Sequence, residues 1–445
     1  MSRYVLIVVV LHFTLCPLCS SVLAAEEADT TFSLAESIAH ALKESTLLKA
    51  AEYAAQGADY ERKAARADFL PVLHTSYGFT RFNEDPHMKS PAGEFAPYPV
   101  DFKIGDKDRY QWNTFLTQPI FTGGALLSSY QIARLGKDIA EESRNRARQE
   151  IILRVKESYF TILKAKNINE VALQAVEQVK SHVEVAQAFY EQEMIPRNDL
   201  LEAEVRYAQV KQDLIRAENG VEIAKAYFNT LLRREVNQPV EVEDIPEYQP
   251  QAFPLEDCLS EAFQRRPEMK EIEFTVEKAE KGVTLSKSRF FPTISLVTDY
   301  QRMGEHADVR GNLYEDAERF MVTTLFSWDV WEWGKKHYQV SASRAKAAQA
   351  GEQKKQVGDA IALEVKESYL NLQEEEKNIV VAKTAIERAE ENFRLNKEKY
   401  NEQMATTTDV LDAQTLLTGA QNNYYNALSD YHIAKARLER AVGRE

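Results

Sequence analysis

Cysteine is scarce in this sequence of 445 residues, which contains only three. Two of them, Cys16 and Cys19, lie in residues 1–25, a segment with a positive residue near its start, an apolar stretch and small residues at its end. This pattern is typical of a secretory signal peptide, and the apolar stretch is short for a membrane-spanning helix. We therefore expect cleavage near Ala24, with lipidation of Cys16 or Cys19 as the alternative. The mature chain then keeps Cys258 alone, which excludes an intrachain disulfide bond.

Several other features are absent after residue 25. No apolar run of about 20 residues occurs, so a chain that crosses a membrane must do so with strands. The formal net charge is −14, and loss of Arg3 with the signal peptide gives −14 − 1 = −15, whereas nucleic-acid binding needs a basic surface. The histidines are scattered, no cluster of potential ligands has metal-binding spacing, and no serine lies in a nucleophile motif. The sequence therefore predicts a protein that is not an enzyme, with no catalytic residue, metal or cofactor.

One structural unit occurs twice in the sequence. Residues 155–159, Val-Lys-Glu-Ser-Tyr, recur at 365–369, and this offset of 210 holds to the end of the chain. Upstream the offset is 221, because Phe69-Leu70-Pro71 matches Phe290-Phe291-Pro292, so the first copy carries an insertion of 221 − 210 = 11 residues. The pattern predicts a duplicated module, with repeats at 26–235 and 253–445 and an extended, proline-rich connector at 236–252.

Two long stretches have the period of a coiled coil. Apolar and small residues recur at alternating spacings of four and three from Ile151 to Tyr190, and again from Ile361 to Tyr400. The first pattern predicts a helix from near Leu126 to a turn at 194–196, with a length of roughly 100 Å. Shorter helices are expected to run back at 198–233 and 407–442, and others are expected before the strands, at 34–67 and 255–287. Helices of this length indicate a rod or a tall wall.

Four stretches alternate with a period of two, at 71–84, 109–121, 293–303 and 319–331. Aromatic and β-branched residues alternate with smaller or polar ones, which predicts one β-hairpin per copy, the first closed by a loop rich in proline and glycine. Four strands alone leave open edges. Each strand is long enough to cross a bilayer when tilted, and in lipid only a closed barrel satisfies every backbone group. We therefore expect several copies of the chain to contribute four strands each to one barrel.

The tryptophans lie near the helix-proximal ends of these strands, at Trp112, Trp328, Trp331 and Trp333. Indole side chains at these positions are typical of the aromatic belt at a membrane interface. The alternative is a sheet packed on the helices, with the tryptophans in its core. The protein would then be a soluble periplasmic coiled-coil adaptor or structural protein.

Two motifs and the order of the elements resemble a known family. The segment Thr408-Asp409-Val410-Leu411-Asp412-Ala413 after Tyr400, the turn Gln118-Pro119-Ile120-Phe121-Thr122-Gly123-Gly124, and the duplicated helix–β-hairpin–helix–helix unit resemble TolC-type outer membrane efflux proteins. The resemblance implies an α+β membrane protein that forms a homotrimer. Three chains would form a 12-stranded outer membrane β-barrel, continued by a long periplasmic α-helical coiled-coil barrel. It implies a passive exit duct of a tripartite efflux or type I secretion system, in outer membrane lipid, which docks a periplasmic adaptor (membrane fusion protein) and an inner-membrane transporter.

The resemblance also assigns candidate site residues. The periplasmic entrance would be constricted at Asp409, Asp412 and Tyr400, with Asp199 and Glu202 at the equivalent positions of the first copy. Rings of carboxylates would bind cations there, whereas the alternative role of Asp409 is to cap its helix. Ala405 stands where the family has an arginine that helps to close the entrance. The adaptor-docking tips would be Met194, Ile195, Pro196 and Arg197 in one copy and Met404, Ala405, Thr406 and Thr407 in the other. We interpret Gly123, Gly124 and Gly334 as turns between strand and helix.

Overall fold

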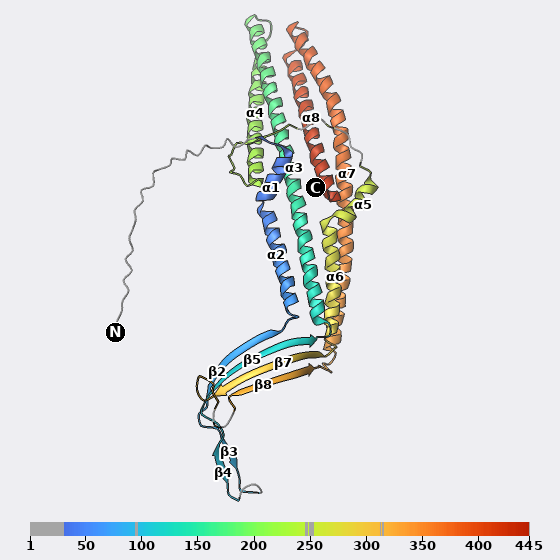
Figure 1. Cartoon of the computed structure of the whole chain (residues 1–445). Helices are drawn as coiled ribbons and strands as arrows, with labels where there is room; N and C mark the ends of the chain where they lie inside the picture. Colours follow the sequence, from blue (N-terminus) through green and yellow to red (C-terminus); the bar gives the residue numbers. More distant parts are fainter. Residues whose placement is uncertain are drawn as a thin grey trace, which may run out of the picture.

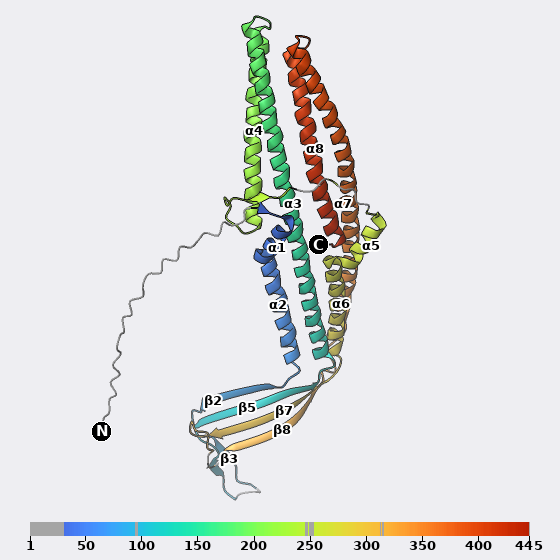
Figure 2. The same ribbon diagram turned by 45° about the horizontal axis from the view of Figure 1, so that its top comes forward.

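The computed structural model describes residues 31–444 except 94–96, 245–247, 249–252, 312 and 314–315. The predicted signal peptide and much of the predicted connector therefore lie outside the described residues. The molecule is elongated: long helices lie side by side, and a four-stranded sheet runs across one end of them (Figures 1 and 2). In the described part of the chain, none of the helices has the length and apolar character needed to cross a bilayer.

The two longest helices confirm the duplication. Helix α3 spans Ala125–Glu191 and α7 spans Lys335–Asn401, and each has 67 residues, or roughly 100 Å. Each begins directly after a glycine in the left-handed conformation. Helices α4 (Arg197–Leu231) and α8 (Thr407–Val442) run back from them, as the sequence predicts.

The predicted helices at 34–67 and 255–287 are each broken in two, so the prediction of one continuous helix is wrong at both sites. Helix α1 (Leu34–Glu44) ends at Ser45, whose side chain caps α2 (Thr46–Ala67) by accepting a hydrogen bond from the Leu48 amide. Helix α5 (Leu255–Arg265) ends at Arg266, and α6 (Pro267–Ser288) follows. Proline pushes the preceding residue into an extended conformation, which accounts for the second break.

The helices form a single layer (Figures 1 and 2). Helix α3 packs against α2 and α4 on one side and against α6 and α8 on the other, and α7 packs against α6 and α8. The layer therefore has one edge formed by α2 and α4 and another formed by α7. Heptad positions such as Val155, Ile162 and Val365 are fully buried between the helices.

The main sheet has the order β2-β5-β7-β8, and all its neighbours are antiparallel. Its strands are β2 (Val72–Arg81), β5 (Asp108–Phe121), β7 (Thr293–Gly304) and β8 (Glu318–Ser327). The predicted fourth strand is four residues too long, because the chain turns after Ser327 and the indole of Trp328 donates to the carbonyl of Phe290 at 3.1 Å. The prediction of a sheet packed on the helices is wrong, because every residue of β8 is exposed, as are Trp328, Trp331 and Trp333.

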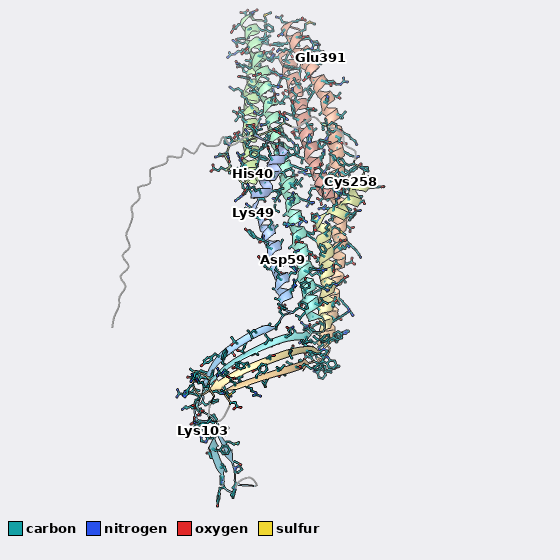
Figure 3. The ribbon with its side chains drawn as sticks, viewed as in Figure 1. His40, Lys49, Asp59, Lys103, Cys258 and Glu391 are labelled. Carbon is teal, nitrogen blue, oxygen red and sulfur yellow. The ribbon has the colours of Figure 1, made fainter. Side chains whose placement is uncertain are left out.

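Two small pairs of strands were not predicted. The loop between β2 and β5 contains the hairpin of β3 (His87–Ser90) and β4 (Val100–Lys103), which projects from the end of the sheet farther from the helices (Figures 1 and 3). Lys103, at the end of β4, pairs with Asp85 at 3.2 Å and Asp106 at 2.9 Å. Beside the helices, β1 (Thr31–Phe32) pairs in parallel with β6 (Glu241–Val242).

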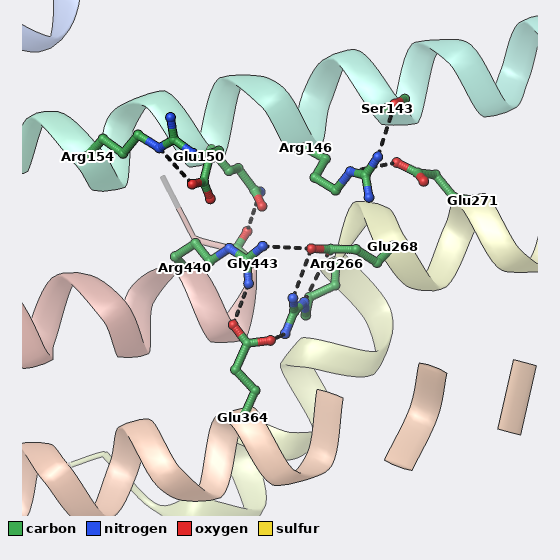
Figure 4. A network of polar contacts seen from close by, with 11 residues as sticks. Ser143, Arg146, Glu150, Arg154, Arg266, Glu268, Glu271, Glu364, Arg440 and Gly443 are labelled. Carbon is green, nitrogen blue, oxygen red and sulfur yellow. Dashed lines mark hydrogen bonds and ion pairs between the residues drawn. The ribbon is translucent and has the colours of Figure 1, made fainter. Parts of the chain in front are cut away.

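A network of buried ion pairs joins four helices where α5, α6 and the end of α8 meet (Figure 4). Arg266 binds Glu268 of α6 at 2.9 Å and Glu364 of α7 at 2.5 Å. Arg440 of α8 binds both of these carboxylates as well. The amide of Gln149, on α3, donates to the carbonyl of Gly443. The first copy has Ser45, Arg154 and Thr230 at the positions of Arg266, Glu364 and Arg440, so the network belongs to the second copy alone.

Candidate functional site at the helical tips

The two helical hairpins end in turns of the same geometry. Glu193 and Gln403, 210 residues apart, both have left-handed backbones, with φ of 56° and 62°. In each turn, the next amide donates back to a helix carbonyl, Met194 to Phe189 at 2.9 Å and Met404 to Lys399 at 2.7 Å. This closure leaves both methionine side chains exposed at the end of the molecule. The sequence-predicted tips are therefore solvent-accessible at their methionines.

Not every predicted tip residue faces solvent. Pro196, Arg197 and Thr406 are exposed, and Ala405 is half-buried. Ile195 packs against the cluster of Ala186, Leu200 and Ala203. Thr407 is buried, and its hydroxyl donates to Tyr400 at 3.2 Å. These last two residues hold the tip structure rather than present a surface.

Asp409 caps the start of α8. Its carboxylate accepts hydrogen bonds from the Thr406 amide at 2.8 Å and the Thr406 hydroxyl at 2.7 Å, while its own amide donates to that hydroxyl at 3.2 Å. The backbone hydrogen bond from Thr406, followed by the side-chain one, lowers the pKa of Asp409. This is a complete capping box. In the first copy, Pro196 occupies the N-cap of α4 and offers no side-chain acceptor, although Asp199 lies in the first turn of that helix.

Tyr400 joins the two hairpins. Its ring lies 4.6 Å from the ring of His182 and 5.5 Å from that of Phe189, both on α3. Burial, with a smaller effect from the charge of Asp199, raises the pKa of Tyr400, while the hydrogen bond from Thr407 opposes the shift. Its equivalent in the first copy, Tyr190, is exposed. Tyr400 therefore contributes a cross-hairpin contact that its repeat equivalent does not make in this chain.

His182 is a residue that the sequence analysis missed. It is buried against Tyr400, and burial together with the charge of Lys397 lowers its pKa to about 4. His182 lies outside the four-and-three spacing of apolar and small residues in α3, so the sequence gives no signal that it is buried. The imidazole is therefore neutral at pH 7, which suits its contact with the aromatic ring.

Helices α4 and α8 face each other across a groove of about 490 Å³ near the tips. Glu202 and Asp412 both line it, so the fold brings these two predicted carboxylates together. The hydroxyl of Thr408 donates to the carboxylate of Glu202 at 3.1 Å. Arg206, also missed from the sequence, donates to Thr415 across the groove at 2.7 Å. Among the residues that the structure describes, no group of His, Cys, Asp and Glu is placed to hold a metal ion.

The three predicted turn glycines lie between strands and helices. Gly124 and Gly334 precede α3 and α7 with φ of 86° and 82°. Gly123 has a φ of 60°, and a Cβ there would lie 2.6 Å from the carbonyl oxygen of Ser288. Only glycine fits at position 123, because both the backbone conformation and the neighbouring chain exclude a side chain.

The described part of the chain thus combines duplicated long helices with a four-stranded sheet at one end and two helical tips at the other. Residues 37–232 and 258–444 match the outer membrane efflux protein family, and the chain belongs to this family. It is therefore an outer membrane protein, and the alternative of a soluble periplasmic adaptor or structural protein is excluded.

Individual relatives are distant in sequence. The chain is 21% identical to the outer membrane protein TolC of Escherichia coli K12 over 305 residues, which span 66% of this chain and 62% of TolC. It is 23% identical to the alkaline protease secretion protein AprF of Pseudomonas aeruginosa over 393 residues, 86% of this chain and 78% of AprF. The solved structure of the outer membrane protein VceC from Vibrio cholerae superposes with a TM-score of 0.78 at 18% identity, covering 92% of this chain and 96% of VceC. The structural match supports the same fold.

Proposed function

We propose that this protein is the passive outer membrane exit duct of a tripartite efflux or type I secretion system and that it works as a homotrimer. The observation that carries the proposal is that the outer edge of the protomer repeats one of its internal seams. Phe160 on α3 is 5% exposed and stacks on His432 of α8 at 4.9 Å, whereas its equivalent on α7, Leu370, is 47% exposed. Val171 is 2% exposed and its equivalent Val381 is 68% exposed. The α7 edge therefore needs a partner that resembles α8.

The other edge of the protomer offers that partner. Helix α4 is the repeat equivalent of α8, and beyond the groove that it shares with α8 it exposes the apolar residues Ile215, Ile223 and Tyr227. A second copy that placed its α4 against α7 would bury both faces. After each such contact, one α4 edge and one α7 edge remain uncovered at the two ends of the assembly. Both are covered only when the assembly closes as a ring.

The sheet supports the same arrangement. In the described part of the chain, β2 and β8 are the outer strands of the main sheet. Since β5 of the first repeat pairs with β7 of the second, β8 is expected to pair with β2 of the next copy. Three copies, the number implied by the family resemblance, would close a 12-stranded barrel and remove every strand edge.

The tips are the proposed docking surface for a periplasmic adaptor. Met194 and Met404 are both exposed, and the two tips are in contact, since the side-chain amide of Gln403 donates to the Met194 sulfur at 3.4 Å. Exposed methionines suit a surface that adapts to a partner. The adaptor would link the duct to an inner-membrane transporter, which supplies the energy. AprF is named for the secretion of a protease, so a secreted protein is one class of cargo for this chain.

The proposal is tested by fractionation and mass measurement of the full chain. The protein is expected in the outer membrane fraction, to require detergent for release, and to have the mass of three chains after correction for bound detergent. A monomer that stays soluble in aqueous buffer without detergent, with all its strands ordered, would contradict both the duct and the trimer.

Carboxylates at the tips are proposed to favour cations. With threefold symmetry, Asp409 and Asp412 would each form a ring of like charges near the entrance. Asp409→Asn combined with Asp412→Asn removes the charge but keeps a capping acceptor at position 409. The double variant is expected to lose block by divalent cations and most of its cation preference in single-channel recordings.

The matched control for this test is Thr406→Ala, which weakens the cap of α8 and leaves both charges in place. If Thr406→Ala changes cation block as much as the double variant does, the capping role of Asp409 accounts for the effect and the ring does not.

A further inference from the structure

The junction between the two repeats is tightly packed near the sheet. The turn that joins β5 to α3 lies against the end of α6 and the start of β7. A Cβ on Gly123 would lie 2.6 Å from the Ser288 carbonyl oxygen and 2.7 Å from Cβ of Phe291. This junction therefore holds its two chain segments in contact and leaves no space for a side chain at position 123.

The duplication predicts an equivalent junction whose two halves lie at opposite edges of the protomer and do not meet within one chain. The repeat offsets hold in the sheet, because the pair Leu73 and Leu116 maps onto the observed pair Ile294 and Phe326. The ion pair at the far end of each hairpin also repeats, Arg81 with Asp108 at 3.4 Å and Arg302 with Glu318 at 3.3 Å. The same offsets map Gly123 onto residue 333, Ser288 onto residue 67, and Phe291 onto residue 70.

One half of this equivalent junction contains a large residue. Trp333 takes the place of Gly123, and its backbone keeps the left-handed conformation, with a φ of 50°. This conformation is unusual for a bulky residue. The indole is 86% exposed, and its ring makes an edge contact with the ring of Trp331 at 6.0 Å. The protomer therefore leaves this large apolar side chain exposed, in a backbone conformation that is strained for tryptophan.

A cavity lies on the other side. It has a volume of about 620 Å³ and is formed at the end of α2 by Ala67, Phe69, Leu70 and Tyr130, with Lys63 and Arg66 beside them. Its lining includes Ala67 and Leu70, the two residues that the repeat offsets pair with position 333. Ala67 and Leu70 are both smaller than the residues that they replace, Ser288 and Phe291. Ala67 and Leu70 still have the carbonyl oxygen and the Cβ that exclude a side chain at position 123, so an indole fits only if the neighbouring turn lies farther from α2 than the Gly123 turn lies from α6.

We propose that Trp333 of each protomer inserts into the cavity beside Ala67 and Leu70 of the next copy of this chain. The proposal rests on the proposed trimer and adds the contact that sets the register between neighbouring subunits at the end of the barrel. The indole would be buried against Phe69 and Leu70, and the ammonium of Lys63 and the guanidinium of Arg66 would lie near its face, where cations are attracted to aromatic rings. Trp333 and the cavity lie on opposite edges of one protomer, so the contact between two copies is heterologous. A closed ring of copies satisfies every such contact.

Disulfide cross-linking of the full-length protein in membranes tests the contact. In a Cys258→Ser background, Trp333→Cys combined with Leu70→Cys is expected to convert most of the monomer band into dimers and trimers under mild oxidation. The matched control is Trp331→Cys with Leu70→Cys, which is expected to cross-link at least ten times less. Trp333→Ala should also lower the temperature at which the trimer dissociates, and Trp331→Ala should not.

A second cysteine pair separates failure of this contact from failure of the trimer. The internal pair Leu116 and Thr298 maps onto Phe326 and Tyr77 of the next copy, so Phe326→Cys with Tyr77→Cys should form intermolecular disulfides. If this pair cross-links and the Trp333 pair does not exceed its control, the trimer stands, and Trp333 lies in the membrane interface instead. If neither pair cross-links, the trimer itself is overturned.

Discussion

Val381→Glu is expected to convert the proposed trimer into monomers in detergent, whereas Val380→Glu is expected to leave it intact. The two valines are adjacent on α7, and both are exposed in the protomer. Their repeat equivalents differ: Val171 is buried, whereas the residue equivalent to Val380 is Glu170, which is exposed. The first repeat thus shows that glutamate is tolerated at one position and that the other is enclosed by a neighbouring helix.

The size of the effect follows from the cost of a buried charge. A carboxylate enclosed at the seam without a partner costs roughly 3 kcal/mol, and three seams close the ring. We expect native gels or analytical ultracentrifugation in detergent to show mainly monomer for Val381→Glu and trimer for Val380→Glu. Equal behaviour of the two variants would mean that α7 does not meet a second copy through the face that α3 uses inside the protomer.

Arg266→Leu is expected to open the region where α5, α6, α7 and α8 meet. The Arg266 side chain is nearly fully buried and binds both Glu268 and Glu364. Its removal leaves two carboxylates in a confined space with Arg440 alone to balance them. Loss of one partner from a buried ion pair costs about 3–5 kcal/mol, and we expect about 3 kcal/mol because Glu364 is partly exposed.

Cys258 provides the readout for this variant. It is buried on α5 (Figure 3), in the same cluster as Val365 and Leu438, and is the only cysteine in the sequence after residue 25. A loss of about 3 kcal/mol corresponds to roughly a hundredfold faster labelling by a thiol reagent. The matched control is Arg265→Leu, since the Arg265 side chain is exposed and its partner Glu261 keeps a second ion pair with Arg444. Similar labelling rates for the two variants would show that the network does not hold the region closed.

The same network makes a prediction for pH. Burial alone would raise the pKa of Glu268, but the hydrogen bond and charge of Arg266 outweigh burial and lower it below its ordinary value of 4.5. A carboxyl group with a lowered pKa stabilises the fold fully above its ordinary pKa and loses this effect as the pH falls through the lowered value. Labelling of Cys258, relative to an unfolded peptide at the same pH, should therefore be constant from pH 7 to about 5 and faster below about 4.

The period of the sequence predicted the long elements well. The coiled-coil repeat predicted α3 to within a few residues and the presence of α7, since a seam between helices requires apolar residues at fixed intervals. The strands were predicted equally well, because aromatic and β-branched residues tend to occur at every second position along each of them. The breaks at Ser45 and Arg266 were missed, although Pro267 in the sequence marks the second one. The hairpin of β3 and β4 was also missed, because both strands are short and lie in a loop rich in proline and glycine.

The candidate site was predictable only in part. Capping of its helix was the alternative role given to Asp409, and the structure contains that cap. Position in the sequence did not distinguish Tyr400 from Tyr190, which occupy equivalent sites and have opposite exposure. His182 and Arg206 gave no signal, because their roles depend on residues about 200 positions away in the chain, namely Tyr400 and Thr415.

The sequence by itself determined the duplication, the helices and strands of each copy and the family, because each of these depends on local periodicity and on motifs that are read along the chain. The tertiary structure decided which of two equivalent residues is covered. Equivalent residues of the two repeats differ in exposure after packing, because each repeat in a single chain meets a different neighbour on each side. The exposed Leu370 and Val381, and the cavity beside Leu70 opposite the position of Trp333, follow from that packing, and no reading along the chain distinguishes them from their buried equivalents.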